Sequence, residues 1–166
     1  MKIFVVLVSA FLTLATWSGA EEANGVRLTA QKTLLEKSKD RDAFNQWDKV
    51  EKALGIKAVV QNISLKSIPE GSIEYIVIVK RWGRTPTAYE KYQGTEKVPA
   101  LLTGAKADLT LAKVPLGGYE IGGNRKQFQD SIEGWQLTIT HEGKETVKLT
   151  STSSFEKLLA KAKPGR

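Results

Sequence analysis

The chain of 166 residues contains no cysteine and only one histidine. Without cysteine it can form no disulfide, no thiolate metal site and no cysteine nucleophile. A zinc site that relies on one histidine would need several carboxylates in addition. No loop of alternating Asp or Asn residues of the calcium-binding kind occurs. We therefore expect neither a metal ion nor a cofactor.

The residue sets that enzymes use are also missing from the sequence. His141 stands at a predicted hairpin turn and is expected to be exposed, and no Gly-x-Ser-x-Gly motif is present. No glycine loop is followed by Lys-Ser or Lys-Thr, the pattern that holds a phosphate. Two acid pairs, Asp130 with Glu133 and Glu90 with Glu96, have no spacing that singles them out for glycoside hydrolysis. The sequence predicts a protein with no enzymatic activity and no catalytic residues.

Long hydrophobic runs are scarce, and the single one lies at the N-terminus. Lys2 precedes an almost wholly apolar run, Ile3–Ala15, and small residues follow at Ser18, Gly19 and Ala20. This three-part layout is typical of a cleavable secretory signal, and the run is shorter than the roughly 20 residues that span a bilayer. We expect residues 1–20 to be a signal peptide and residues 21–166 to form a single domain with no membrane span.

Export together with the lack of cysteine favours a bacterial protein, periplasmic or extracellular, since secreted animal proteins of this size often carry disulfides. Basic residues outnumber acidic ones, 25 to 18, for a net charge of +7. The charges are spread along the chain, which favours solubility as their role. Contact with an anionic envelope surface is a second interpretation, and a nucleic-acid partner is not expected.

Strand-like patterns dominate the remainder of the chain. Alternating or continuously apolar stretches predict strands over 26–34, 49–62, 73–79, 107–111, 132–140 and 147–149. A helical spacing over 43–54 is the alternative for part of the second of these. Charged or glycine-rich stretches predict loops over 37–45, 85–99 (with one short edge strand) and 117–124.

A short helix is expected at the C-terminus. Ser153 and Glu156 have the spacing of a capping box, and the apolar side chains after them share one helical face. Pro164 should end this helix. Strands joined by turns, with no helix between them, predict an all-β fold: an antiparallel β-sandwich of about seven strands with a short C-terminal helix.

Two segments carry a resemblance to known domains. The glycine turn and strand over 102–111 and the hairpin over 135–144 resemble bacterial immunoglobulin-like and fibronectin-III-like domains. The resemblance implies that the sandwich is an immunoglobulin-like β-sandwich and that the protein is an adhesive or accessory module. The Cys…Trp…Cys signature of disulfide-bonded immunoglobulin domains is absent.

Aromatic and basic residues gather where the 73–79 strand ends. Trp82, Tyr89 and Tyr92 lie near Arg81 and Arg84. If they are exposed together, they form a platform for a protein partner or for sugar rings, because aromatic rings and arginine are favoured at binding hot spots. The alternative is that the rings pack over the end of the sandwich.

The sequence therefore predicts an exported, non-enzymatic β-sandwich that binds a protein or glycan partner or belongs to the cell envelope. A carbohydrate-binding module that uses the aromatic residues near Trp82 is the alternative. A secreted enzyme with two close acids in a cleft is the third hypothesis.

Overall fold

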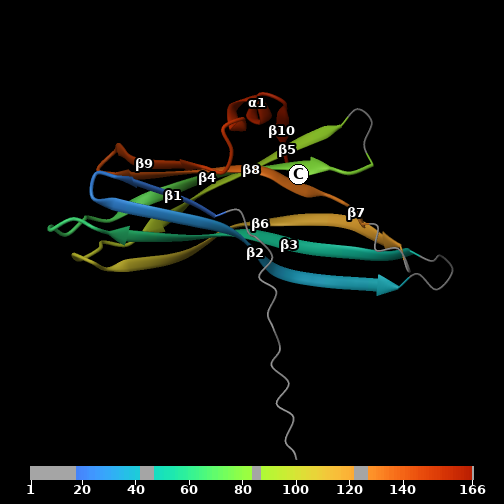
Figure 1. Ribbon diagram of the computed structural model, residues 1–166, viewed down its shortest axis with the longest axis horizontal. Helices are drawn as coiled ribbons and strands as arrows, with labels where there is room; N and C mark the ends of the chain where they lie inside the picture. The colour runs from blue at the N-terminus through green and yellow to red at the C-terminus, as the bar shows by residue number, and fades with distance from the viewer. Residues whose placement is uncertain (1–17, 42–46, 84–86, 122–126, 166) are drawn as a thin grey trace, which may run out of the picture.

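The computed structural model describes residues 18–41, 47–83, 87–121 and 127–165, and these form an all-β structure with two five-stranded sheets (Figure 1). The first sheet has the order β1 (Ser18–Ala23), β2 (Val26–Arg41), β3 (Trp47–Asn62), β6 (Lys106–Ile121) and β7 (Gln127–Gln129). The second has the order β10 (Ala162–Pro164), β5 (Ala88–Val98), β4 (Gly71–Arg81), β8 (Ser131–His141) and β9 (Lys144–Thr150). Neighbouring strands are antiparallel except β10, which runs parallel to β5.

One hydrophobic core joins the two sheets. Leu28, Ile56 and Leu111 of the first sheet and Val77 and Trp135 of the second are fully buried members of the same cluster. Trp135 shares strand parity with Leu137 and Ile139, a pattern that predicts its burial, and it is 0% exposed. β4 is the middle strand of its sheet and buries residues on both faces, since Ile78 is 0% exposed although it lies outside the cluster between the sheets. Ile78 pairs with Gly134, the residue against which α1 (Phe155–Leu159) packs. Within the described ranges no helix is long and apolar enough to cross a membrane.

Three segments predicted as loops are strands. β2 continues to Arg41, β5 runs from Ala88 to Val98, and β6 continues through Gly117 to Ile121. Charged residues are tolerated in β2 because Lys39 pairs across the sheet with Asp48. The local composition was misleading, since an established neighbouring strand supplies the backbone partners whatever the side chains are.

The C-terminal helix packs against β8 at Gly134, where the strand has a bulge. A glycine inside an apolar strand pattern indicates a bulge, and the register between β4 and β8 does shift between Ile78 and Val79, next to Gly134. A Cβ on Gly134 would lie 3.3 Å from side-chain carbons of Phe155 and Leu158, so the absence of a side chain lets the helix approach.

The C-terminal helix is present but shorter than predicted. α1 spans Phe155–Leu159, and the residue before it, Ser154, makes no side-chain capping bond. The expected continuation of the helix through Ala162 is wrong, because Ala162–Pro164 forms β10 beside β5. Phe155 anchors the helix through a side chain that is 1% exposed.

The N-terminal edge strand begins before the predicted signal cleavage point. Ser18, Gly19 and Ala20 pair with Gln31, Ala30 and Thr29 of β2. A Cβ on Gly19 would lie 3.1 Å from Leu149 Cδ1 and 3.5 Å from Trp135 Cη2, so this backbone covers the core. Cleavage after Ala20 would leave β1 with its last three residues.

We expect a chain that begins at Glu21 to unfold more easily than one that begins at Ser18. Its free energy of unfolding should be about 2 kcal/mol lower, because the ladder bonds of residues 18–20 and the cover over Leu149 are lost. Urea unfolding of the two chains measures this, with Glu21→Gln in the longer chain as a control on an exposed position. Equal stabilities would show that residues 18–20 contribute nothing to the fold.

Candidate functional site

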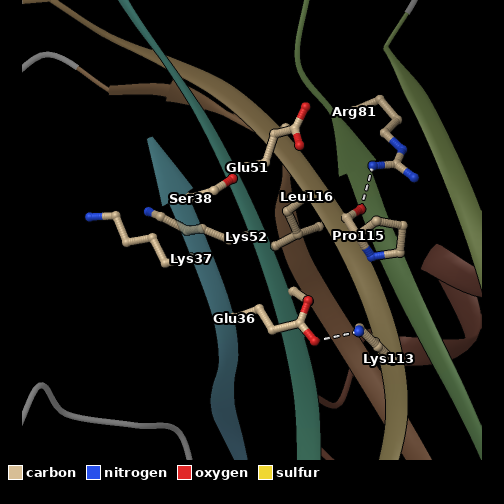
Figure 2. Close-up of a pocket in the computed structure, with 11 residues that line it drawn as sticks. Glu36, Lys37, Ser38, Glu51, Lys52, Arg81, Lys113, Pro115 and Leu116 are labelled. Carbon is tan, nitrogen blue, oxygen red and sulfur yellow. Dashed lines mark hydrogen bonds and ion pairs between the residues drawn. The ribbon is translucent and has the colours of Figure 1, made fainter. Parts of the chain in front are cut away.

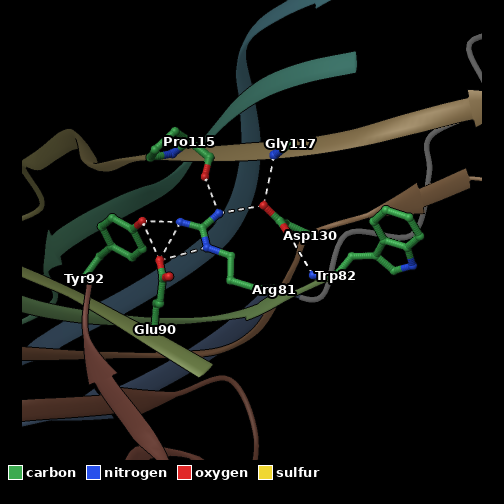
Figure 3. A network of polar contacts seen from close by, with 7 residues as sticks. All are labelled: Arg81, Trp82, Glu90, Tyr92, Pro115, Gly117 and Asp130. Atoms are coloured by element: carbon green, nitrogen blue, oxygen red, sulfur yellow. Dashed lines mark hydrogen bonds and ion pairs between the residues drawn. The ribbon is translucent and has the colours of Figure 1, made fainter. Parts of the chain in front are cut away.

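Arg81, at the end of β4, makes polar contacts with both sheets (Figure 3). Its Nε donates to Glu90 Oε2 at 2.8 Å within the second sheet. Its Nη1 donates to Asp130 Oδ2 at 2.6 Å and to the Pro115 carbonyl oxygen at 3.0 Å. Pro115 belongs to β6 in the first sheet. Nη2 donates to the Tyr92 hydroxyl. The guanidinium thus links β4 and β5 to β6.

Asp130 lies where the chain passes from β7 in one sheet to β8 in the other. Its Oδ1 accepts a hydrogen bond from the Trp82 backbone N–H at 2.9 Å, and its Oδ2 accepts one from the Gly117 N–H at 3.0 Å. The Asp130 N–H donates in turn to the Gly117 carbonyl at 2.9 Å. One carboxylate therefore holds the ends of β4 and β6 together.

The network is largely removed from solvent. The side chains of Arg81, Glu90 and Asp130 are each 12% exposed. Burial alone would lower the pKa of Arg81, but hydrogen bonds to the two carboxylates outweigh it and raise that pKa above its ordinary value. Burial also raises the pKa of Tyr92, whose ring lies 5.7 Å from the Arg81 Cζ. Both side chains keep their usual charge state at neutral pH.

Trp82 and Tyr119 form an exposed aromatic pair beside this network. Trp82 is 44% exposed and Tyr119 is 41% exposed. Their ring centroids are 6.2 Å apart and their planes meet at 62°, an edge-to-face arrangement. We call these two residues the aromatic pair. Tyr119 belongs to β6 in the first sheet, whereas Trp82 directly follows β4 of the second sheet.

The structure divides the residues that the sequence grouped together. Tyr92 and Arg81 turn toward one another in the buried network. Tyr89 is half-buried on β5, opposite Lys80, and Arg84 lies outside the described residues. Trp82 is the member of the predicted set that is both described and largely exposed.

Sequence reasoning missed both Tyr119 and Asp130. Tyr119 lies in the stretch predicted as a glycine-rich loop. The missed signal is the alternation of Val114, Leu116 and Gly118, which are buried, with exposed residues between them. Asp130 was considered only as an acid paired with Glu133, and nothing local indicates its contacts with Arg81, 49 residues away.

A cleft of about 830 Å³ lies next to the network, between the outer ends of the first-sheet strands and Arg81 (Figure 2). Its charged lining residues are Glu36, Lys37, Glu51, Lys52, Arg81 and Lys113. Both acids of the cleft are ion-paired, since Glu36 pairs with Lys113 and Glu51 pairs with Lys49 outside the cleft. Lys52 donates to the uncharged amide oxygen Oε1 of Gln129 at 2.7 Å. The two acids that line the cleft are therefore already engaged by lysines.

The two acid pairs considered for catalysis have other contacts. Glu90 and Asp130 both bind the same guanidinium, and Glu133 accepts a hydrogen bond from Ser131 at 2.5 Å. Across the described part of the chain, no three His, Cys, Asp or Glu side chains are grouped so that they could hold a metal ion.

His141 is buried, so its predicted exposure is wrong. It is 7% exposed at the end of β8, with Nδ1 3.0 Å from Thr146 Oγ1. Its Nε2 has no hydrogen-bond partner among the described residues and lies against Gly71, whose added Cβ would be 3.0 Å away. Burial lowers the pKa of His141, and the neighbouring charge of Glu142 opposes this only in part. His141 precedes a turn, but Thr146 of β9 and Gly71 of β4 lie against its ring and keep it from solvent.

Comparison with protein-family models, with curated proteins and with solved structures found no match. The functional conclusion therefore depends on the residues of this chain.

Replacing Asp130 with Asn should destabilise the protein strongly. The largely buried Arg81 would lose a charged acceptor, as would the Trp82 and Gly117 N–H groups, which costs on the order of 3 kcal/mol. Thermal and urea unfolding measure the loss. Asp108→Asn, on an exposed carboxylate of β6 that pairs loosely with Lys57 at 3.7 Å, is the matched control and should have little effect. Similar losses for both variants would contradict a special role for the network.

The stability of the protein should fall as pH drops below about 6.5, the usual pKa of an unfolded histidine. His141 then binds a proton in the unfolded state but stays neutral in the folded state, where burial lowers its pKa. The free energy of unfolding therefore falls by up to about 1.4 kcal/mol per pH unit. The fall should level off once the pH is below the folded-state pKa. Urea unfolding between about pH 7.5 and 5 tests this. His141→Gln should flatten the slope, and an unchanged slope in that variant would assign it to other groups.

Proposed function

We propose that this protein is an exported, non-enzymatic binding module with an immunoglobulin-like or fibronectin-III-like β-sandwich fold. The strand order supports the fold assignment. Seven strands form the sets β2-β3-β6 and β5-β4-β8-β9. In immunoglobulin lettering these correspond to A-B-E facing C′-C-F-G. The remaining strands, β1, β7 and β10, are short additions at the sheet edges.

The aromatic pair is the observation that carries the binding function. Large aromatic side chains are normally buried, and an exposed Trp beside an exposed Tyr is typical of a binding hot spot. The backbone of Trp82 is fixed through Asp130, so binding would order few additional groups. The module binds its partner through Trp82 and Tyr119.

A protein partner suits the pair better than a sugar. A sugar ring stacks on a flat aromatic surface, whereas these two rings meet at 62° in an edge-to-face arrangement and do not form one flat surface. Carbohydrate binding stays as the second candidate, because the indole face of Trp82 is large enough to receive one sugar ring alone. An enzyme is disfavoured because Glu90 and Asp130 are held by Arg81.

Trp82→Ala and Tyr119→Ala should each abolish most partner binding. We expect a loss of at least about thirtyfold for Trp82→Ala, the effect typical of a hot-spot residue. The wild-type protein is screened against envelope protein extracts and a glycan array, and each positive interaction is then measured with both variants. Leu65→Ser, an exposed apolar residue far from the pair, is the matched control.

The screen separates the two candidates. Protein hits that disappear in both variants support the protein-binding module, and glycan hits that depend on Trp82 alone support the carbohydrate-binding alternative. Interactions that survive in both variants with the fold intact overturn the proposed site.

A further inference from the structure

The strand β10 forms an edge of the second sheet, next to β5 (Figure 1). Its residues Ala162–Pro164 run parallel to Tyr89–Lys91 of β5, and the Gly165 N–H that follows donates to the Lys91 carbonyl at 2.8 Å. We call residues 162–165 the strap. Without the strap, β5 would be the edge strand of its sheet.

Gly165 lies directly against the ring of Tyr92. A Cβ on Gly165 would lie 2.9 Å from Cζ of that ring and 3.1 Å from both Cε1 and Cε2. An alanine at this position would therefore have to push the phenol group aside. The φ of Gly165 lies outside the left-handed region, so the backbone itself would accept an alanine. The strap thus contacts the hydroxyl end of Tyr92, because Cζ is the carbon that carries the hydroxyl.

The Tyr92 hydroxyl connects the strap to Arg81 (Figure 3). It accepts a hydrogen bond from Arg81 Nη2 and donates one to Glu90 Oε2 at 3.2 Å. The same Glu90 oxygen accepts from Arg81 Nε at 2.8 Å. Two side chains of β5 therefore hold one side of the guanidinium, while Asp130 binds its other side through Nη1.

The strap also covers β5 where these two side chains begin. Lys163 is the register partner of Glu90, and Glu90 is buried although its strand lies next to the sheet edge. Hydrogen bonds between charged groups are stronger where water is excluded. Detaching the strap would open the β5 side of the network to solvent and weaken its hold on Arg81.

We propose that the strap positions the aromatic pair. Gly165 and Tyr92 are positioning residues for Trp82, and their effect passes through Arg81 to Asp130. Asp130 Oδ1 accepts the Trp82 N–H at 2.9 Å, so a shift of Asp130 moves the backbone that carries the exposed indole. This inference deepens the proposed function and rests on it, because Trp82 is the residue to which partner binding is assigned.

The strap is suited to regulate the pair, because it is one of the easiest parts of the fold to detach. It has three paired residues and a single neighbouring strand. Short segments with few buried contacts open locally at a lower free energy than core strands do. Attachment of the strap therefore sets how rigidly Trp82 is presented to a partner, and a rigid Trp82 leaves less to be ordered on binding.

The first test measures hydrogen exchange of the Trp82 backbone N–H by NMR. Tyr92→Phe removes the hydroxyl and Gly165→Ala displaces the ring, so each variant should raise this exchange rate about tenfold, because Asp130 is less firmly held. The N–H groups of Val77 and Leu137, both fully buried in the second sheet, report on the fold as a whole and should exchange as in the wild type.

Tyr89→Phe is the matched control for the loss of a hydroxyl. Tyr89 lies on the same strand and is the register partner of Ala162 in the strap. Within the described part of the chain its hydroxyl makes no hydrogen bond, so this variant should leave the exchange of the Trp82 N–H unchanged.

The second test reads the geometry of the aromatic pair itself. In an edge-to-face pair the indole of Trp82 shifts the NMR signals of the Tyr119 ring. Tyr92→Phe and Gly165→Ala should each reduce this shift. The double variant should show a change no larger than that of the stronger single variant, because both substitutions act on one contact.

Unchanged exchange of the Trp82 N–H in both single variants overturns the proposal. Equal acceleration at Trp82, Val77 and Leu137 also overturns it, since the strap would then stabilise the whole fold and not the pair. Additive effects in the double variant overturn the route through the Tyr92 hydroxyl. None of these measurements uses a partner. A partner that binds Trp82→Ala as tightly as the wild type would therefore refute the proposed function and leave the positioning by the strap in place.

Discussion

The contact between Arg81 and Asp130 determines how the two sheets meet at the aromatic end. The strands of the first sheet that flank the core have 16 residues each, and those of the second have 11. The first sheet therefore extends past the second, and hydrophobic packing alone cannot hold them where the second sheet ends. A charged network replaces the core at that point. Asp130 is well placed for it, because the chain changes sheets at this residue.

A buried ion network is not an efficient way to gain stability, since desolvation of the charges opposes their attraction. Its directional bonds do specify one geometry, which apolar packing would not. Arg81 contacts two carboxylates, a tyrosine hydroxyl and a backbone carbonyl in fixed directions. Trp82 is the next residue, and its N–H is bound to the same Asp130. The backbone position of the exposed Trp82 therefore depends on the network around Arg81, the residue before it.

The features that sequence reasoning predicted are those with a local cause. Ile73–Val79 is recognisable as a strand from its own run of apolar residues, and Trp135 shares its parity with Leu137 and Ile139, which are fully buried. The errors lie where long-range contacts decide. Ala88–Val98 is a strand because β4 offers it a full-length partner, although glycine and charges make it resemble a loop. His141 is buried by β9 although it precedes a turn. No pattern in one segment could bring Tyr119 beside Trp82, because the two come from different sheets.

The two ends of the molecule share one physical principle. Exposed apolar side chains on a mobile loop would gain free energy by collapsing onto the nearest surface. At both ends a buried polar side chain prevents this by binding the backbone that carries them: Asp130 holds the Trp82 N–H, and Asn62 holds the Lys66 and Leu101 carbonyls. Breaking these bonds to let the loop collapse would cost free energy that offsets what the collapse returns. The fold thereby keeps apolar side chains in water at two separate places, Trp82 at one end and Leu65 and Leu102 at the other.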